Sequence, residues 1–253
     1  SRLAPLIGSQ PSARALAQTR TPDEVYGIAL ERGRAMRGLG ITVDFAPVVA
    51  VTGNSSAIGD RSFGDDPATV TDYAGAYTRG LRDAGVLPVL KHFPGHGRAS
   101  GDSHTGSVST PPLADLMTDD LVPYRTLTTA APVAVMVGHM QVPGLTGSDP
   151  ASLSPAAYQL LRSGGYGGPG FNGVVYTDDL SSMGAINQRY GVAEAVLRAL
   201  QAGADNALWI STAEVPAVLD GLEQALASGA LSQAAVDASL QRNAAAKGGV
   251  RCG

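Results

Sequence analysis

The sequence has 253 residues, of which 44% are hydrophobic and 16% are charged, so the chain can bury a sizeable core and is not compositionally disordered. Its formal net charge of −4 and its lack of a basic stripe argue against a nucleic-acid partner. The longest apolar run, 130–137, is too short to cross a membrane. The single cysteine, Cys252, excludes a disulfide framework and a multi-cysteine zinc site.

Amphipathic helices alternate with short β-rich runs along the whole chain, and we interpret residues 1–253 as one domain. The first helix has clear start signals: Thr21 as N-cap, Pro22 as first helical residue and Glu24 completing a capping box. The following elements are a strand at 41–46, a helix at 67–84, a strand at 86–91, a helix at 114–127, a strand at 133–137, a helix capped by Ser154 and ended by Gly164, a strand at 173–178, a helix at 193–202, a strand at 205–210, and helices at 214–227 and 233–246.

This alternation predicts an α/β fold of parallel strands joined by right-handed crossovers. Several predicted strands end in polar residues, namely Asp44, Lys91 with His92, His139, and Asp178 with Asp179. An open doubly wound sheet would gather such groups at one switch point, whereas a barrel collects them from many strand ends. We therefore expect a TIM-type (β/α) barrel. Its five strand–helix units are fewer than the eight of a complete barrel.

Three of the four histidines, His92, His96 and His104, lie in one glycine-rich segment. They could bind a metal together with Asp102, although the spacing does not match a helical His-Glu-x-x-His site. Alternatively, Asp102 and His104 form a proton-transfer pair, because residues two apart project to the same side of an extended chain. The fourth, His139, is as well explained by a structural hydrogen-bonding role.

Other candidates also keep more than one interpretation at this stage. Asp178 or Asp179 at a barrel mouth can be a covalent nucleophile or a loop anchor. Arg61 can bind a sugar or a carboxylate, or pair with a neighbouring aspartate. Lys91 can bind a sugar hydroxyl, form a Schiff base or lie exposed. The glycine-rich stretch 164–173 lacks the Gly-Lys-Ser/Thr of a phosphate loop.

The motif KHFPGHG at 91–97, followed by Asp-Ser-His at 102–104, resembles the signature of bacterial β-N-acetylglucosaminidases of glycoside hydrolase family 3. The segments 44–47, 58–64 and 177–183 occur in the same order as in that family. The resemblance implies a retaining mechanism, with Asp178 as the nucleophile, His104 as the acid/base and Asp102 as its partner. It also implies that Arg61, Lys91 and His92 bind the sugar, without a metal or an organic cofactor.

The resemblance also marks a difference at the start of the chain. Family members carry an Asp-x-Glu-Gly-Gly-Arg-Val stretch before a segment similar to 1–6, and this sequence lacks it. We therefore expect a native N-terminal extension of two to three strand–helix units. Without it, the strand at 41–46 should be an open sheet edge, the sugar pocket should lack one wall and the chain should be poorly active.

The sequence thus predicts a monomeric exo-β-N-acetylglucosaminidase acting on small glycans such as cell-wall muropeptides. An N-acetylglucosaminide phosphorylase, a metal-dependent hydrolase and a non-catalytic sugar-binding module are the alternatives. Family members from lysine-poor genomes are often envelope lipoproteins, and only Lys91 and Lys247 are lysines here. An extracytoplasmic location is therefore favoured over a cytoplasmic one.

Overall fold

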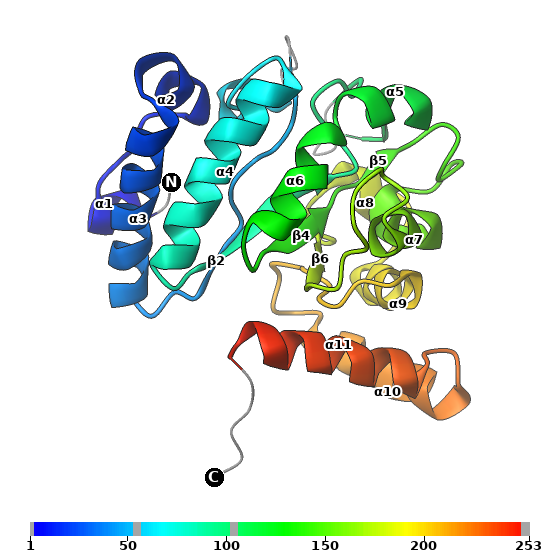
Figure 1. Cartoon of the computed structure of the whole chain (residues 1–253). Coiled ribbons are helices and arrows are strands. Elements are labelled where there is room, and N and C mark those ends of the chain that lie inside the picture. Colours follow the sequence, from blue (N-terminus) through cyan, green and yellow to red (C-terminus); the bar gives the residue numbers. More distant parts are fainter. Residues whose placement is uncertain (1–2, 53–56, 102–105, 249–253) are drawn as a thin grey trace.

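The computed structural model describes residues 3–52, 57–101 and 106–248. Its main sheet has four parallel strands in the order β1-β2-β4-β6 (Figure 1). Strand β1 is Val43–Asp44, β2 is Leu87–Phe93, β4 is Ala134–Val137 and β6 is Val175–Thr177. In register, Val43 pairs with Leu87, Val89 with Ala134, and Val135 with Val175. The predicted parallel α/β organisation is confirmed.

The fifth predicted strand, 205–210, extends this sheet beyond β6 through a short parallel bridge between Tyr176 and Asn206. The Thr177 amide donates to the Asn206 carbonyl at 3.0 Å, and the Leu180 amide donates to the Leu208 carbonyl at 2.8 Å. The bridge lies where the sequence predicted a strand, but it covers less of the segment than expected.

The sheet is curled like the wall of a barrel. Phe45 directly follows β1 and Tyr176 lies on β6, yet their rings meet edge to face with centroids 5.3 Å apart. Strands that are three places apart in a flat sheet would be separated by about 14 Å. Within the described ranges β1 has β2 as its one neighbouring strand, so the barrel wall is open at β1. The predicted TIM-type architecture, incomplete beside the first strand, is confirmed.

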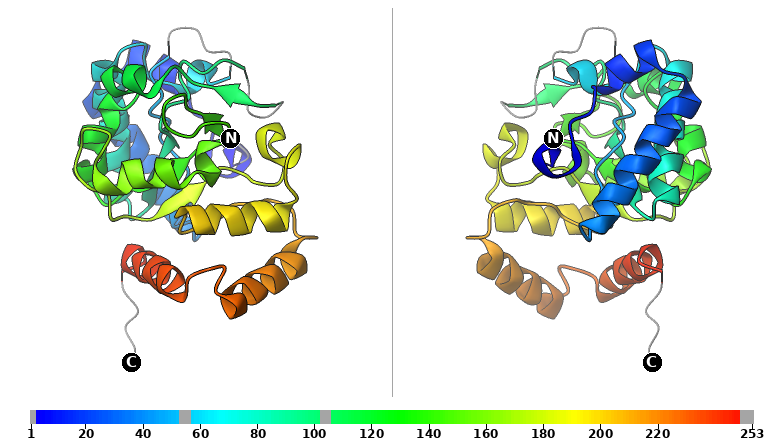
Figure 2. Two further views of the ribbon diagram at one scale, coloured as in Figure 1. Left: turned by 90° about the vertical axis from the view of Figure 1, so that its right-hand side faces the viewer. Right: turned by 90° about the vertical axis from the view of Figure 1, so that its left-hand side faces the viewer.

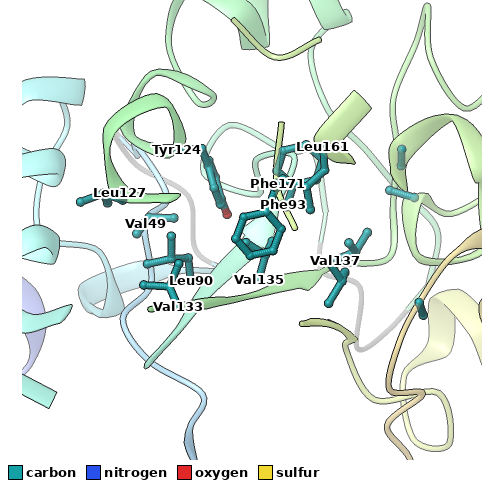
Figure 3. Packing of buried hydrophobic residues seen from close by; sticks show 14 of the residues in the cluster. Val49, Leu90, Phe93, Tyr124, Leu127, Val133, Val135, Val137, Leu161 and Phe171 are labelled. Carbon is teal, nitrogen blue, oxygen red and sulfur yellow. The ribbon is translucent and has the colours of Figure 1, made fainter. Parts of the chain in front are cut away.

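Both faces of the strands carry apolar residues, as parallel strands require. On the helix-covered face, Phe93 packs edge to face on Tyr124 at 5.2 Å, and Leu90, Val135 and Leu161 complete the surrounding core (Figure 3). Val89, Ala134, Met136 and Val174 form a smaller cluster on the concave face. Side chains alternate along β2, so Lys91 lies on the same face as Val89.

The two longest helices begin at the predicted residues, Pro22 and Pro67, and the cap predicted for the first of them is confirmed. Helix α3 is Pro22–Gly38, and its capping box is formed: Thr21 Oγ1 accepts from the Glu24 amide at 3.3 Å, and Glu24 Oε2 accepts from the Thr21 amide at 2.8 Å. Helix α4 is Pro67–Asp83, with Asp66 as N-cap. Together they cover one side of the sheet (Figure 1).

The prediction of one helix over 114–127 is wrong. The structure has α5 at Leu113–Thr118 and α6 at Val122–Ala130. The backbone leaves helical geometry at Asp119, with φ −139° and ψ −82°. Two features account for the break: Pro123 has no amide hydrogen to continue the helical ladder, and the buried Asp120 side chain is bound by Arg98.

The later helices agree with the predicted positions. They are α7 at Pro155–Ser163, α9 at Val192–Ala202, α10 at Val215–Ser228 and α11 at Gln233–Ala246. Ser154 precedes α7, but its side chain makes no capping hydrogen bond, so that part of the prediction is wrong. Elements that the sequence did not suggest are helices α1 at Ala4–Ile7, α2 at Ala13–Thr19 and α8 at Gly184–Asn187, the 3-10 turns η1 at Gly59–Arg61 and η2 at Ala151–Leu153, and a small parallel sheet of β3 at Val108–Ser109 and β5 at Met140–Gln141.

Helices α10 and α11 form a layer below the rest of the molecule (Figures 1 and 2). A cavity of about 480 Å³ separates α11 from the amino ends of the strands, between residues such as Leu87 and Asn243. The carboxyl ends of the strands therefore lie on the opposite side from α11. Among the described residues, none of the helices has the length and apolar character needed to cross a membrane.

Candidate active site

The carboxyl ends of β2, β4 and β6 are tied side by side. The Gly138 amide donates to the Phe93 carbonyl at 3.0 Å, and the Asp178 amide donates to the Val137 carbonyl at 2.9 Å. Because the strands are parallel, Lys91 and His92, His139 and Asp178 come to the same edge of the sheet. The structure thus brings together three of the predicted site residues, Lys91, His92 and Asp178, from two strands.

Asp178 presents one carboxylate oxygen toward the site. Its Oδ1 accepts from the Asp179 amide at 2.9 Å, and its Oδ2 lies 3.5 Å from His92 Nε2. Burial raises the pKa of Asp178, but its neighbours, first among them His92, together with the hydrogen bond from the Asp179 amide lower that pKa further than burial raises it. The side chain keeps 21% of its surface exposed. Asp178 is therefore an ionised carboxylate that a ligand can reach.

His92 is buried beside this carboxylate. Burial lowers the pKa of His92 to about 3, and Lys91, His96 and Arg61 add to that effect while Asp178 opposes it. The imidazole is therefore neutral at neutral pH and has an N–H to donate. Its ring packs edge to face on His96, with centroids 5.8 Å apart.

Asp179 is used differently from its neighbour. Its Oδ1 accepts from the Ser181 amide at 2.9 Å and from Ser181 Oγ at 2.7 Å, and its Oδ2 accepts from the Ser182 amide at 3.2 Å and from Ser182 Oγ. Burial raises the pKa of Asp179, and these four hydrogen bonds lower it further than burial raises it. Both oxygens hold the turn after β6, which is the role of a loop anchor.

Both ring nitrogens of His139 make contacts that hold neighbouring segments of the chain. Its Nε2 donates to the Asp179 carbonyl at 2.8 Å, and its Nδ1 is 2.7 Å from Ser152 Oγ. The carbonyl can only accept, so Nε2 carries a hydrogen. These contacts favour the structural interpretation of His139, as a residue that fixes the backbone beside Asp178.

Lys91 and Arg61 supply positive charge near the carboxylate. Burial lowers the pKa of Lys91, with Asp178 and Asp44 acting against burial. Arg61 lies exposed in η1, where it donates to the Ile58 carbonyl at 3.2 Å and to the Ala57 carbonyl at 2.6 Å. Its charge acts on Lys91 and His92, which places it near the same edge.

Two of the three neighbouring aspartates that could pair with Arg61 (Asp60, Asp65 and Asp66) have other roles. Asp65 pairs with Arg14 at 2.5 Å, and Asp66 caps α4.

Asp102 and His104 lie outside the described residues. The described chain on either side of them is held near the carboxyl edge: the Ser100 amide donates to the Ser109 carbonyl at 2.8 Å, and Ser109 pairs in β3 with β5, which follows β4. Within the described ranges, no group of three or more His, Cys, Asp or Glu side chains is arranged to hold a metal ion.

The glycines of the 91–97 motif have a packing role. A Cβ on Gly97 would lie 2.0 Å from the Val51 carbonyl oxygen, and a Cβ on Gly95 would lie 2.5 Å from Asp120 Cβ. The chain after β2 therefore passes against two other segments with no room for a side chain. Sequence reasoning missed Asp120 because residues 114–127 were predicted as one continuous helix.

The family model described as "Glycosyl hydrolase family 3 N terminal domain" matches residues 1–245. The chain belongs to glycosyl hydrolase family 3. Beta-hexosaminidase LpqI of Mycobacterium tuberculosis is 70% identical over 252 residues, which are 98% of this chain and 65% of that protein. The chain thus spans less than two thirds of this curated relative.

Solved structures of family 3 proteins agree with the fold. A family 3 glycosyl hydrolase from Mycobacterium smegmatis is 83% identical, has a TM-score of 0.97, and is matched over 99% of this chain and 77% of that one. A family 3 β-N-acetylglucosaminidase from Paenibacillus is 34% identical with a TM-score of 0.88, over 94% of this chain and 45% of that one. The TIM-like barrel of family 3 is therefore the fold to which this chain contributes.

Proposed function

We propose that the protein containing this chain is a retaining exo-β-N-acetylglucosaminidase that removes terminal N-acetylglucosamine from small glycans. The observation that carries the proposal is the ionised Asp178 at the end of β6, with Oδ2 facing neutral His92 while Asp179 is consumed as a loop anchor. Relatives named beta-hexosaminidase support the same substrate class.

In the first step, Asp178 Oδ2 attacks the anomeric carbon, and the glycosidic C–O bond breaks as a glycosyl ester forms. His104 gives its proton to the departing oxygen, with Asp102 holding the imidazole in the required tautomer. Lys91, His92 and Arg61 bind sugar hydroxyls.

In the second step, His104 takes a proton from water, and the water oxygen attacks the anomeric carbon. The ester bond to Asp178 breaks and the carboxylate returns. No metal or organic cofactor takes part in this scheme.

Trapping the glycosyl-enzyme tests the proposal. Incubation with an activated 2-deoxy-2-fluoroglucoside, or with a slowly hydrolysed N-acetylglucosaminide, should add the mass of one glycosyl group to the intact protein. Peptide sequencing by mass spectrometry should locate that mass on Asp178. A label on Asp179, or turnover without any covalent adduct, would contradict the nucleophile assignment.

Turnover assays, combined with the trapping experiment, separate the alternative functions. If phosphate accelerates turnover and glycosyl phosphate is the product, the enzyme is a phosphorylase. If chelators abolish turnover and a metal restores it, the enzyme is a metal-dependent hydrolase. Binding of the sugar with neither turnover nor label would indicate a sugar-binding module.

We further propose that the protein works as a monomer on muropeptides in the cell envelope. The support for the location is the family resemblance together with the near absence of lysine. Fractionation of the source cells tests it: the activity should follow the envelope fraction, and recovery in the cytoplasmic fraction would contradict the proposed location.

A further inference from the structure

His139 lies between β4 and β5 and contacts the residue that follows the proposed nucleophile. Its Nε2 donates to the Asp179 carbonyl at 2.8 Å, and its Nδ1 lies 2.7 Å from Ser152 Oγ. The exposed fractions of His139 and Ser152 are 1% and 0%. The imidazole is therefore shielded from solvent and bound at both nitrogens, one residue away from Asp178.

Ser152 is itself held in place by the 3-10 turn η2 and by α7. The Ser152 amide donates to the Gly138 carbonyl at 2.9 Å, and the hydroxyl of Tyr158 donates to the Ser152 carbonyl at 2.7 Å. Tyr158 is also buried. The backbone of Ser152 is thus bound on both sides of its Cα, so its hydroxyl meets the imidazole of His139 from a fixed position.

The backbone of Asp179 is fixed in the same way. Its amide donates to Asp178 Oδ1 at 2.9 Å, and its carbonyl accepts from His139. The next amide along the chain, that of Leu180, donates to the Leu208 carbonyl at 2.8 Å. Both polar groups of the peptide unit between Asp179 and Leu180 are therefore bound. Without the bond from His139 this unit would gain freedom to rotate, and the amide that holds Oδ1 would be less well placed.

These bonds determine which oxygen of Asp178 is free to react. Oδ1 is bound by the Asp179 amide, whereas Oδ2 faces the site and lies 3.5 Å from His92 Nε2. The terminal torsion of an aspartate side chain has broad energy wells, so an unbound carboxylate turns readily. A fixed Asp179 amide restricts that rotation and keeps Oδ2 directed into the site.

We infer that His139 and Ser152 are positioning residues for the nucleophilic step: the imidazole holds the Asp179 backbone, and so keeps Asp178 Oδ2 aimed at the anomeric carbon. The inference rests on the proposed function, in which Asp178 is the nucleophile. Neither His139 nor Ser152 contacts the sugar in this scheme. Their substitution should therefore slow the formation of the glycosyl ester and leave sugar binding unchanged.

Inactivation by a dinitrophenyl 2-deoxy-2-fluoroglucoside tests this role. Its leaving group departs without help from an acid, so the rate reports the attack of the carboxylate. The rate constant at saturation, kinact, measures that attack, and the half-saturating concentration, KI, measures binding. Both are properties of the active molecules alone, so a fraction of misfolded protein does not change them.

Two substitutions of His139 form a matched pair. Gln carries its amide nitrogen at the same number of bonds from Cβ as Nε2, so His139→Gln keeps a donor for the Asp179 carbonyl. Asn carries its amide nitrogen at the distance of Nδ1, so His139→Asn loses that donor. Since a misplacement of about 1 Å can cost about 100-fold in rate, we expect kinact to fall about 10- to 100-fold in His139→Asn and to recover largely in His139→Gln. KI should be unchanged in both variants.

Three further variants serve as references. Ser152→Ala keeps the imidazole and removes its second contact, so kinact should fall, but less than in His139→Asn. Arg162→Ala removes a 2.7 Å ion pair to the fully buried Asp205, beside the first residue of β6. It should lower the melting temperature and leave kinact and KI unchanged. Asp178→Asn should resist inactivation.

Each outcome has a distinct meaning. If Asp178→Asn resists inactivation but kinact is unchanged in His139→Asn, or falls equally in His139→Gln, the positioning role is wrong and the proposed function stands. A change in KI alone would also overturn the positioning role. If the His139 variants do not fold, an unchanged kinact in Ser152→Ala overturns it. If Asp178→Asn is still inactivated, the proposed nucleophile is wrong, and the positioning role is overturned with it.

Discussion

Asp178 and Asp179 are adjacent in the chain but have different surroundings, and this difference predicts different consequences of substitution. Asp178→Asn removes the attacking carboxylate while keeping its size, so turnover should be lost with little change in stability. Asp179→Asn removes a charged acceptor of four hydrogen bonds. One hydrogen bond to a charged group contributes about 1.5–3 kcal/mol, so the free energy of unfolding should fall by at least about that amount.

Kinetics and urea denaturation of both variants check this prediction. Asp179→Asn should keep measurable turnover at temperatures where it is folded. Complete loss of turnover in both variants at unchanged stability would contradict the division of roles.

His92 should make the stability of the protein depend on pH. The pKa of His92 is about 3 in the folded protein and 6.5 in the unfolded chain. Below pH 6.5 the unfolded chain takes up a proton that the buried imidazole does not accept, so the folded state loses stability as the pH falls from about 6.5 toward 3.

Replacing His92 by Gln removes this contribution. Urea denaturation at pH 5 and pH 7 should show a smaller loss of unfolding free energy on acidification for His92→Gln than for the unsubstituted protein. His96 and His139 are present in both proteins, so the difference reports on His92 and on the groups that it contacts. Equal losses in the two proteins would contradict a lowered pKa.

Sequence spacing predicted some residue roles well and left others open. Thr21 and Glu24 form their capping box because that contact is local. The choice between Asp178 and Asp179 could not be made from spacing or strand-end position, because it depends on how the turn at Ser181 and Ser182 folds back on Asp179. Asp102 and His104 lie outside the described residues, so their roles stay predictions.

Helix α11 shows how polar contacts can attach an element that has no buried residue. Asp205, buried next to β6, accepts from Ser239 Oγ at 2.7 Å and from Arg242 Nε at 2.9 Å, both on α11, and from Arg162 Nη2 at 2.7 Å. It also accepts from the Val175 amide at 2.8 Å. A single carboxylate thus joins α11 to α7 and the sheet.

Asp205→Ala should therefore loosen α11. It leaves two arginines without their carboxylate, a change that costs about 3–5 kcal/mol for a buried pair. Urea denaturation should report a loss of that order, and amide exchange should accelerate in α11. Leu240→Ala, on the exposed side of the same helix, is the control and should change stability by less than about 0.5 kcal/mol. Equal effects of both changes would show that α11 is not attached through Asp205.

The periodicity of apolar residues located the long helices. It did not reveal elements that depend on contacts between segments far apart in the chain. Helix α11 was predicted with its observed ends, because its limits are set by local residues. The break between α5 and α6 was missed, since it is stabilised by Arg98 from another part of the chain. Strands β3 and β5, of two residues each, carry no periodic pattern that a sequence could reveal.

The curl of the whole sheet can be measured through Phe45 and Tyr176. Their edge-to-face contact joins the two outermost of the four paired strands. An aromatic pair contributes about 0.5–1.5 kcal/mol beyond its buried area. A double-mutant cycle with Phe45→Leu and Tyr176→Leu should give a coupling energy in that range by urea denaturation. A coupling near zero would indicate that the sheet is flatter than described.

The parallel arrangement and the barrel type followed from the alternation of elements, and the open edge at β1 followed from counting five strand–helix units. The degree of curvature of the sheet could not be predicted from the sequence, because it depends on contacts between segments far apart in the chain, such as that of Phe45 with Tyr176. The layer formed by α10 and α11 was likewise predicted as two helices but not as a layer under the strands.

The spacing of paired strands has a consequence for how this protein is made. Val43 pairs with Leu87, Val89 with Ala134 and Val135 with Val175, so each ladder joins segments about forty residues apart. At a synthesis rate of about 5–20 residues per second, each apolar strand waits about two to eight seconds for its partner to leave the ribosome. Helix α4 can form while β1 waits for β2, and helices α5 and α6 can form while β2 waits for β4. The yield of folded protein should thus depend on translation rate and on chaperones that shield these strands.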